Sequence, residues 1–232
     1  MEQVNIACAR LDGVRVDFPS KFAISALPYL WDDEKNHQIC FLSSRQWAQA
    51  TKRDEFGSMV SSSDLVLPAS DSLRAKVLAQ GKNAERAWPV PFTYQILLDA
   101  LFQSDEDETS APAVAALESY RPQRVLTLLL SAIERRGGSL FLIGGAPLTL
   151  LKAERNIRAT YPGITIVGSM NGQYRTEEES ALLQAIQKGT PSLILAGDPL
   201  PEGERWIPRH MSATRIGIFL YYGPILRWFS GR

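Results

Sequence analysis

The chain has 232 residues, of which 45% are hydrophobic, and its 25 Lys and Arg residues balance 25 Asp and Glu residues. This length suffices for one large α/β domain or two small ones. The balanced charge argues against a nucleic-acid-binding protein, because phosphate contacts normally appear as a basic excess.

The N-terminal residues and the cysteines bear on the cellular compartment. Glu2, Asn5 and Arg10 interrupt the apolar stretch that a signal peptide needs. No run approaches the ~20 apolar residues of a transmembrane helix. The two cysteines, Cys8 and Cys40, lack C-x-x-C spacing. We therefore expect a cytoplasmic protein in which both thiols are reduced core residues.

The first part of the chain alternates strand patterns with helix patterns. Apolar or alternating runs predict strands at residues 14–18, 38–42 and 65–67. Helical spacing predicts helices at residues 21–31, 70–79 and 94–102. Ser43 and Ser44 suit the cap of a further helix. In the helix at 70–79, we expect Leu73, Val77 and Leu78 to point inward.

Residues 103–111 are acidic, polar and low in complexity, which predicts a mobile surface loop. We interpret residues 1–232 as a single α/β domain, in which this loop joins two halves at residues 1–102 and 112–232.

The second half carries the clearest pattern. A helix over residues 122–136 is expected to end at Gly137. Three short apolar runs then predict strands at residues 140–143, 164–167 and 193–196. Helical segments separate these runs, and Thr176 with Glu179 suggests a capping box at the start of the second segment. A strand at residues 215–220 and a short helix at residues 223–230 complete the chain. The pattern predicts a Rossmann-like three-layer α/β/α fold with a mostly parallel sheet.

Glycines follow each of the three predicted strands: Gly144 and Gly145, then Gly168 and Gly172, then Gly197. Parallel strands bring their carboxyl ends to one edge of a sheet, which is where such sheets bind ligands. We therefore expect Gly144, Gly145, Gly172 and Gly197 to line one cleft.

Two loops could contact an anionic or polar ligand. Ala146 and Pro147 open a helix after the first glycine pair, where backbone N–H groups and the helix dipole favour an anion. A tight turn without a ligand is the alternative. The glycines do not form G-x-G-x-x-G and no acidic residue ends the next strand, which argues against NAD. In the loop at residues 197–207, Glu204 could accept hydrogen bonds from sugar hydroxyls or stabilise a helix dipole, and Trp206 is expected in the core.

These two loops and several shorter segments resemble, in order and spacing, the consecutive motifs of the WecG/TagA/CpsF glycosyltransferases. The shorter segments are residues 13–17, 65–68, 85–86, 162–164, 167–168, 171–174 and 177–179. That family joins a nucleotide-activated amino sugar to a lipid-linked sugar. The resemblance implies a UDP-N-acetylhexosamine donor and a polyprenyl-diphosphate-linked acceptor, in cell-envelope or exopolysaccharide biosynthesis.

The resemblance also implies roles for individual residues. The nucleotide-sugar site would comprise Gly144, Gly145, Ala146, Pro147, Gly172, Tyr174, Gly197 and Glu204. Ser43 and Arg86 would contact the acceptor or the diphosphate. We expect no metal or cofactor, because the only histidines, His37 and His210, belong to no cluster with metal-ligand spacing.

The chain departs from the family pattern at positions that carry chemistry. The family's Asp-Gly, whose Asp is thought to activate the acceptor hydroxyl, is replaced by Ala69 and Ser70. Asp71 is the candidate replacement base, and the alternative is that Asp71 helps to cap a helix near Ser70. The other departures are Ser43-Ser44 for Thr-x-Asn, Gly203 for the Gln before Glu204, and Leu226-Arg227 for Phe-Asp. An arginine-rich appendage implicated in membrane docking is expected after the family's last helix, whereas this chain ends at Arg232.

These departures leave three hypotheses about function open. The chain is either a divergent transferase or a catalytically inactive relative that binds a nucleotide sugar or serves as a scaffold. An unrelated nucleotide-binding α/β protein is a third hypothesis. We expect at most peripheral contact with the inner face of the cell membrane, through Arg227, Arg232 and neighbouring aromatic residues. The alternative is an aromatic helix that covers the sheet. A homo-oligomer or an envelope-assembly partner is compatible with the sequence.

Overall fold

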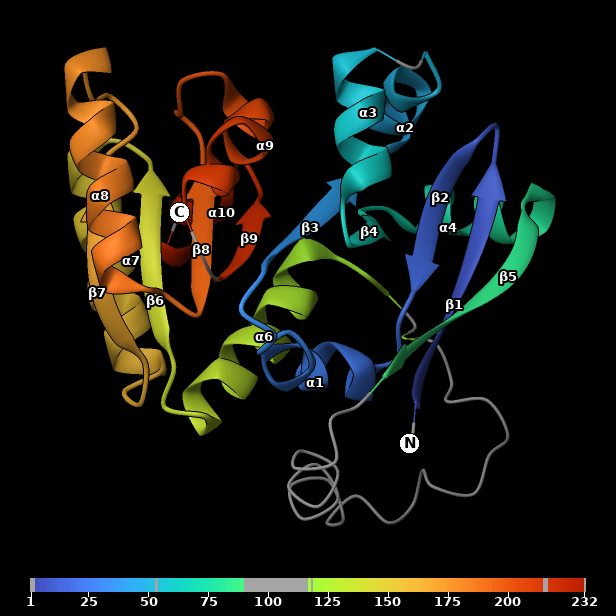
Figure 1. Ribbon diagram of the computed structural model, residues 1–232, viewed down its shortest axis with the longest axis horizontal. Coiled ribbons are helices and arrows are strands. Elements are labelled where there is room, and N and C mark those ends of the chain that lie inside the picture. The colour runs from blue at the N-terminus through green and yellow to red at the C-terminus, as the bar shows by residue number, and fades with distance from the viewer. Residues whose placement is uncertain (1–2, 53, 90–116, 118, 215–216, 232) are drawn as a thin grey trace. The chain divides into compact units, whose positions relative to one another are not determined.

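The computed structural model describes residues 3–52, 54–89, 117, 119–214 and 217–231 (Figure 1). The described residues of Met1–Asp33, Leu42–Ser61 and Leu65–Leu129 form one compact unit, and those of Glu34–Phe41, Ser62–Asp64 and Leu130–Arg232 form a second. The expected helix at 94–102 and the acidic loop at 103–111 lie outside the described residues. The single-domain interpretation stays a prediction.

The strands and helices alternate along most of the chain (Figure 1). The strands are β1 Gln3–Leu11, β2 Val14–Phe18, β3 Asn36–Leu42, β4 Leu65–Pro68, β5 Lys82–Pro89, β6 Ser139–Gly144, β7 Thr165–Met170, β8 Leu193–Gly197 and β9 Gly217–Tyr221. The helices are α1 Lys21–Leu30, α2 Ser44–Ala50, α3 Glu55–Ser62, α4 Asp71–Gln80, α6 Pro122–Arg135, α7 Pro147–Thr160, α8 Glu179–Gly189, α9 Trp206–His210 and α10 Ile225–Phe229. Short 3-10 turns lie at Thr176–Glu178, Gly203–Arg205 and Met211–Ala213.

An antiparallel sheet of order β2-β1-β5 lies in the first unit. Only β2 was predicted from the sequence. Asp12 and Gly13 both have positive φ and join β1 to β2 as a two-residue hairpin, in which Leu11 pairs with Val14. Asp-Gly is a strong hairpin signal, from which β1 could have been predicted. No comparable signal exists for β5, whose sequence Lys82–Pro89 is polar and charged.

The larger sheet is parallel, has six strands and runs in the order β4-β3-β9-β8-β6-β7. It confirms the predicted Rossmann-like three-layer fold, including the three strands after residue 138. The path from β6 through α7 to β7 moves one way across the sheet, and the path through α8 to β8 moves back past β6. Because parallel crossovers are right-handed, α7 and α8 cover opposite faces.

Alternating side chains of the parallel strands build the core of the second unit. One face contributes Phe141 and Ile143 from β6, Ile194 from β8 and Phe219 from β9. These residues pack with Leu182 and Ile186 of α8 and with Trp206 and Ile207 of α9. Trp206 has no exposed surface, which confirms it as a core residue.

Gly168 was expected in a turn after its strand, but β7 continues through it to Met170. The register between β6 and β7 shifts at Phe141, which pairs with Gly168. A Cβ atom on Gly168 would lie 2.4 Å from the Phe141 ring. The glycine therefore serves strand packing and does not end the strand.

In α4, Leu73 and Val77 are buried as predicted, whereas Leu78 is 45% exposed. The prediction for Leu78 was wrong because Leu73 and Val77 already define the inward stripe, and the next residue turns about 100° away from Val77.

The expected capping box of Thr176 and Glu179 was also wrong. The carboxylate of Glu178 accepts the backbone N–H of Arg175 at 2.7 Å, so the reciprocal contact lies one residue earlier. A 3-10 turn at Thr176–Glu178 precedes α8, so the first helical turn begins after Arg175 and the capping pair is Arg175 with Glu178. Glu179 is thereby available to side chains outside its own turn.

Cys8 and Cys40 are buried and free, as expected. Burial, with a smaller contribution from the Glu204 carboxylate, raises the pKa of Cys40 to about 12, so its thiol stays protonated. Among the described residues, no helix combines the length and apolar character needed to cross a membrane.

Candidate functional site

The loop after β6 begins with two glycines that have positive φ, +113° at Gly144 and +70° at Gly145. Gly144 pairs with Gly197 at the ends of β6 and β8. A Cβ atom on Gly144 would lie 1.8 Å from the carbonyl oxygen of Gly197. Both the backbone conformation and the close approach of the two strands therefore require glycine at position 144.

The loops after β7 and β8 join the same cluster. The Gly172 N–H donates to the carbonyl oxygen of Gly145 at 3.0 Å. A Cβ atom on Gly172 would lie 1.5 Å from the carbonyl oxygen of Pro199, and one on Gly197 would lie 2.6 Å from Ile225. The four predicted glycines thus meet at one carboxyl edge of the sheet. Their Cβ positions face neighbouring protein atoms, so packing alone accounts for their identity.

The start of α7 lies at this edge. Ala146 is its N-cap and makes no side-chain cap hydrogen bond, and Pro147 occupies the first turn. The first helical N–H groups therefore point outward without a side-chain acceptor from the cap residue, and the positive end of the helix dipole lies beside the glycines. This arrangement suits an anion.

Asp198 directly follows Gly197 and was not among the predicted site residues. Its backbone N–H donates to the carbonyl oxygen of Gly223 at 2.8 Å, and its carboxylate accepts the Tyr221 hydroxyl at 2.7 Å. Burial, together with the bond to Asp198, raises the pKa of Tyr221. A carboxylate next to the end of a parallel strand is a signal that the sequence offered.

The same loop continues through Glu202 and Gly203, both in the left-handed region with φ near +60°. Glu202 accepts the Arg209 guanidinium at 2.6 Å, which ties the turn to α9. Glu204 lies in the 3-10 turn and is partly exposed. Its negative charge adds to the raised pKa of Cys40 and of Tyr221, so this carboxylate lies near both side chains.

A hydrogen-bonded chain of side chains fixes the loop after β7 to α8 and α9. The buried indole of Trp206 donates to the Tyr174 hydroxyl at 2.7 Å, and that hydroxyl reaches Glu179 at 3.3 Å. His210 lies 3.2 Å from the same Glu179 oxygen and stacks on Trp206 with ring centroids 4.8 Å apart. Burial, assisted by the Glu179 charge, raises the pKa of Tyr174 to about 12. The phenol is therefore neutral at physiological pH.

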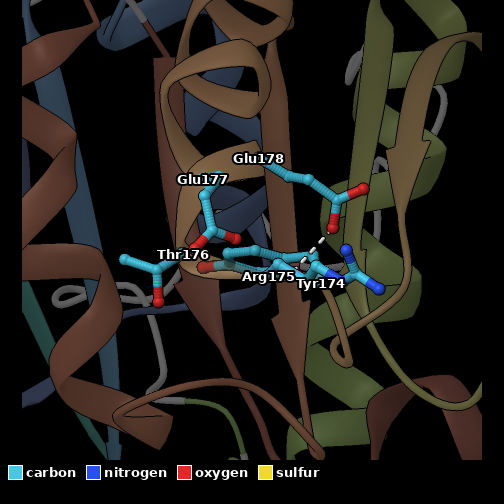
Figure 2. Close-up of a pocket in the computed structure, with 5 residues that line it drawn as sticks. All are labelled: Tyr174, Arg175, Thr176, Glu177 and Glu178. Carbon is cyan, nitrogen blue, oxygen red and sulfur yellow. Dashed lines mark hydrogen bonds between the residues drawn. The ribbon is translucent and has the colours of Figure 1, made fainter.

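An open pocket of about 740 Å³ lies where this loop enters α8, lined by Tyr174, Arg175, Thr176, Glu177 and Glu178 (Figure 2). Figure 2 shows the Glu178 carboxylate folded back toward the backbone of Arg175. Tyr174, a predicted site residue, is part of this lining. One cation, two carboxylates and two hydroxyls suit a polyhydroxylated ligand better than a purely anionic one.

In the first unit, Asp71 is the first residue of α4 and its side chain is 58% exposed. Ser70 is the N-cap, and its hydroxyl accepts the Leu73 N–H at 3.3 Å. The Asp71 carboxylate lies 3.6 Å from the Arg121 guanidinium. The Ser70 hydroxyl therefore supplies the cap hydrogen bond, and Asp71 is a first-turn carboxylate beside it. A catalytic role for Asp71 stays a prediction.

Ser43 and Arg86 also have structural partners. Ser43 caps α2 in a capping box with Gln46, which confirms the predicted cap. The Arg86 guanidinium lies 3.4 Å from a carboxylate oxygen of Asp17, which is fully buried and also accepts the backbone N–H of Val66 at 2.8 Å. These contacts orient the side chains of Ser43 and Arg86.

Across the described part of the chain, no group of three or more His, Cys, Asp or Glu side chains converges to hold a metal ion.

The last helix bears on the expected membrane contact. Ile225 and Leu226 of α10 are buried, and α10 packs against α7 and β8. Trp228 and Phe229 are half-buried and contact each other. The helix therefore covers the sheet through Ile225 and Leu226, and membrane contact by the half-buried aromatic residues stays a prediction.

Comparison with protein families identifies the second half of the chain. The model of the "Glycosyl transferase WecG/TagA/CpsF family" matches residues 117–232, which is half of the chain. The match includes the glycine loops, the pocket and the Asp198 loop. The resemblance of residues 13–17, 65–68 and 85–86 lies before the match and stays a prediction. The chain belongs to the WecG/TagA/CpsF family of glycosyl transferases.

Proposed function

We propose that the chain transfers an N-acetylhexosamine-type sugar from a UDP donor to a polyprenyl-diphosphate-linked acceptor, in cell-envelope or exopolysaccharide biosynthesis. The observation that carries this proposal is the convergence of three strand-end loops, through Gly144, Gly172 and Gly197, beside the uncapped start of α7. Family membership supports a glycosyltransferase role for that edge.

The donor has two chemically different parts, and the edge of the sheet offers a partner for each. The N–H groups that open α7 after Ala146 suit the diphosphate, because they combine hydrogen-bond donors with the positive end of a helix dipole. The polar pocket at Tyr174 suits sugar hydroxyls, which donate to carboxylates and accept from Arg175. Glu204 is the proposed further acceptor for a sugar hydroxyl.

The proposed reaction needs a base and a stabiliser of the leaving group. The Asp71 carboxylate would take the proton of the acceptor hydroxyl as that oxygen attacks the anomeric carbon, and UDP would leave with the bonding electrons. Arg86 and Ser43 are the proposed contacts of the acceptor or the diphosphate. A missing base typically reduces the rate by roughly 10²–10⁴-fold.

A second candidate function is a catalytically inactive relative that binds a nucleotide sugar or acts as a scaffold. The observation that favours it is the local geometry of Asp71, which starts a helix capped by Ser70 and lies beside Arg121. Ala69, at the position where the family pattern has its Asp, carries no proton acceptor.

The two candidates differ in a binding and turnover experiment. UDP and UDP-N-acetylglucosamine binding is measured by calorimetry, and transfer is measured with a polyprenyl-diphosphate acceptor in detergent. The transferase proposal expects turnover by the wild type and a fall of roughly 100-fold in Asp71→Asn, with unchanged UDP affinity. Glu55→Gln is the matched control, because Glu55 is also a first-turn carboxylate, on α3.

The results of this experiment separate the candidates. Binding without turnover in the wild type supports the inactive relative. Turnover that survives in Asp71→Asn contradicts the role of Asp71. A chain that binds neither UDP nor the UDP sugar contradicts the transferase and the nucleotide-sugar-binding relative, and only the scaffold role remains.

A further inference from the structure

The outward face of α7 carries two exposed leucines, Leu148 and Leu151, at 72% and 62% exposure. The other large hydrophobic residues that are exposed in the described part of the chain, Leu78 and Val167, reach only 45% and 38%. The opposite face of α7 is already buried through Leu150, Ala153 and Ile157. The two leucines therefore contribute nothing to the core that anchors this helix.

The same face carries two exposed cations. Lys152 and Arg155 follow Leu148 by four and seven residues, so the four side chains share one stripe of the helix. We call this stripe the α7 face: Leu148, Leu151, Lys152 and Arg155. The nearest carboxylate along the helix, Glu154, accepts Arg158 at 3.1 Å and is bonded to the Ser169 hydroxyl. Its charge is thus directed toward Arg158 and β7.

Leucines beside Lys and Arg on one helix face match the two layers of an anionic lipid surface. Apolar side chains enter the boundary between head groups and acyl chains, and cations stay at the lipid phosphates. A second copy of the chain fits less well, because a two-fold contact over this stripe would gather two Lys and two Arg side chains in one small interface with no carboxylate from the stripe. Four side chains also fall short of the ~800 Å² that each partner buries in a stable protein interface.

We propose that the α7 face docks on an anionic membrane surface. The α7 face begins three residues after Gly145, so docking holds the glycine edge close to the lipid. The functional benefit of holding the glycine edge close to the lipid rests on the proposed function, because a polyprenyl-linked acceptor resides in the membrane. The docking itself depends only on the exposed residues of α7.

Vesicle co-sedimentation of the full chain tests the proposal. Vesicles of phosphatidylcholine mixed with phosphatidylglycerol should bind the wild type, and binding should weaken as salt rises. The variant Leu148→Ser with Leu151→Ser should lose about tenfold or more in vesicle affinity. Leu78→Ser is the matched control, because it removes an exposed leucine from another helix and should leave the affinity unchanged.

The charged half of the face has its own variant. Lys152→Glu with Arg155→Glu should abolish the preference for anionic over neutral vesicles, whereas Lys188→Glu, on the exposed side of α8, should not. A wild type that does not sediment with anionic vesicles overturns the proposal. So does binding that survives both double variants. Dimers that dissociate in the leucine variant, without vesicle binding by the wild type, would assign the face to a second copy and also overturn it.

UDP calorimetry on the same samples separates this proposal from the proposed function. Vesicle binding without UDP binding upholds docking and contradicts the nucleotide-sugar site. UDP binding without vesicle binding contradicts docking and upholds the nucleotide-sugar site. Circular dichroism of the leucine variant checks that it is folded.

Discussion

The glycine edge of the second unit and the loop after β4 in the first unit are determined by different kinds of contact. At the glycine edge, Gly144 and Gly172 face backbone atoms of other loops at distances that no side chain fits. In the loop after β4, Ser70 bonds to Leu73 in its own helix and Asp71 is exposed. Close backbone packing leaves no room for a side chain in the first region, whereas the side chains of Ser70 and Asp71 make only a helix cap and an exposed ion pair.

This difference teaches how to interpret the departures from the family pattern. We expect substitution at Asp71 to cost little stability, because its side chain is exposed, so this position can change its chemistry without loss of the fold. The glycines cannot change without cost, whether or not a ligand binds there. Packing therefore explains these glycines without a ligand, and the proposed catalytic role of the loop after β4 is a question for the turnover experiment.

The largest expected effect is on stability at the glycine edge. Gly144→Ala should lower the free energy of unfolding by more than about 3 kcal/mol, because it combines overpacking with a strained backbone. Gly137→Ala is the matched control. Gly137 also has a positive φ, of +64°, but no atom lies within 4 Å of its Cβ position. Gly137→Ala should therefore lower the free energy of unfolding, measured with urea, by only about 1 kcal/mol. Equal costs for both variants would contradict the packing argument.

Tyr174→Phe should cost about 1–3 kcal/mol, because the buried indole N–H of Trp206 loses its acceptor. Tyr222→Phe is the control, since the Tyr222 ring is partly exposed and contacts Phe41 edge-on. It should change the free energy of unfolding by less than about 0.5 kcal/mol in the same urea titration. A Tyr174→Phe chain as stable as the wild type would show that the hydroxyl network does not stabilise the loop.

The raised pKa of Tyr174 predicts an alkaline limit of stability. The phenol ionises at about 10.0 when unfolded and at about 12 when folded. The stability from its neutral form is therefore fully present below pH 10 and is lost as pH rises from 10 to 12. Between these values the free energy of unfolding should fall less steeply in Tyr174→Phe than in the wild type. Parallel pH profiles for the two proteins would contradict the raised pKa.

The smallest expected effects lie in the loop after β4. Ser70→Ala should cost about 1 kcal/mol through loss of the α4 cap. Asp71→Asn should cost no more than about 0.5 kcal/mol, because the carboxylate is exposed and its contact with Arg121 is a surface ion pair. Thermal or urea unfolding of both variants checks the order. An Asp71→Asn chain that is the less stable of the two would identify Asp71 as the main cap.

The sequence by itself determined the elements whose signals are local. The parallel strands β6, β7 and β8 are short apolar runs separated by helical segments, and the cap at Ser43 depends on residues within one turn. The carboxyl-edge position of Gly144, Gly172 and Gly197 follows from the rule that parallel strands end on one side. Family motifs placed in order along the chain were likewise readable from the sequence.

Only the tertiary structure decided which partners these residues meet. Gly168 lies within β7 because the Phe141 ring occupies the space beside it, and that contact joins residues 27 positions apart. The bonds from Trp206 to Tyr174 and from Tyr221 to Asp198 also join separate elements. The polar strand β5 forms because β1 offers it a free edge. Contacts of this kind join segments that are far apart in the sequence. A local pattern of residue types does not specify which distant segments will pack together.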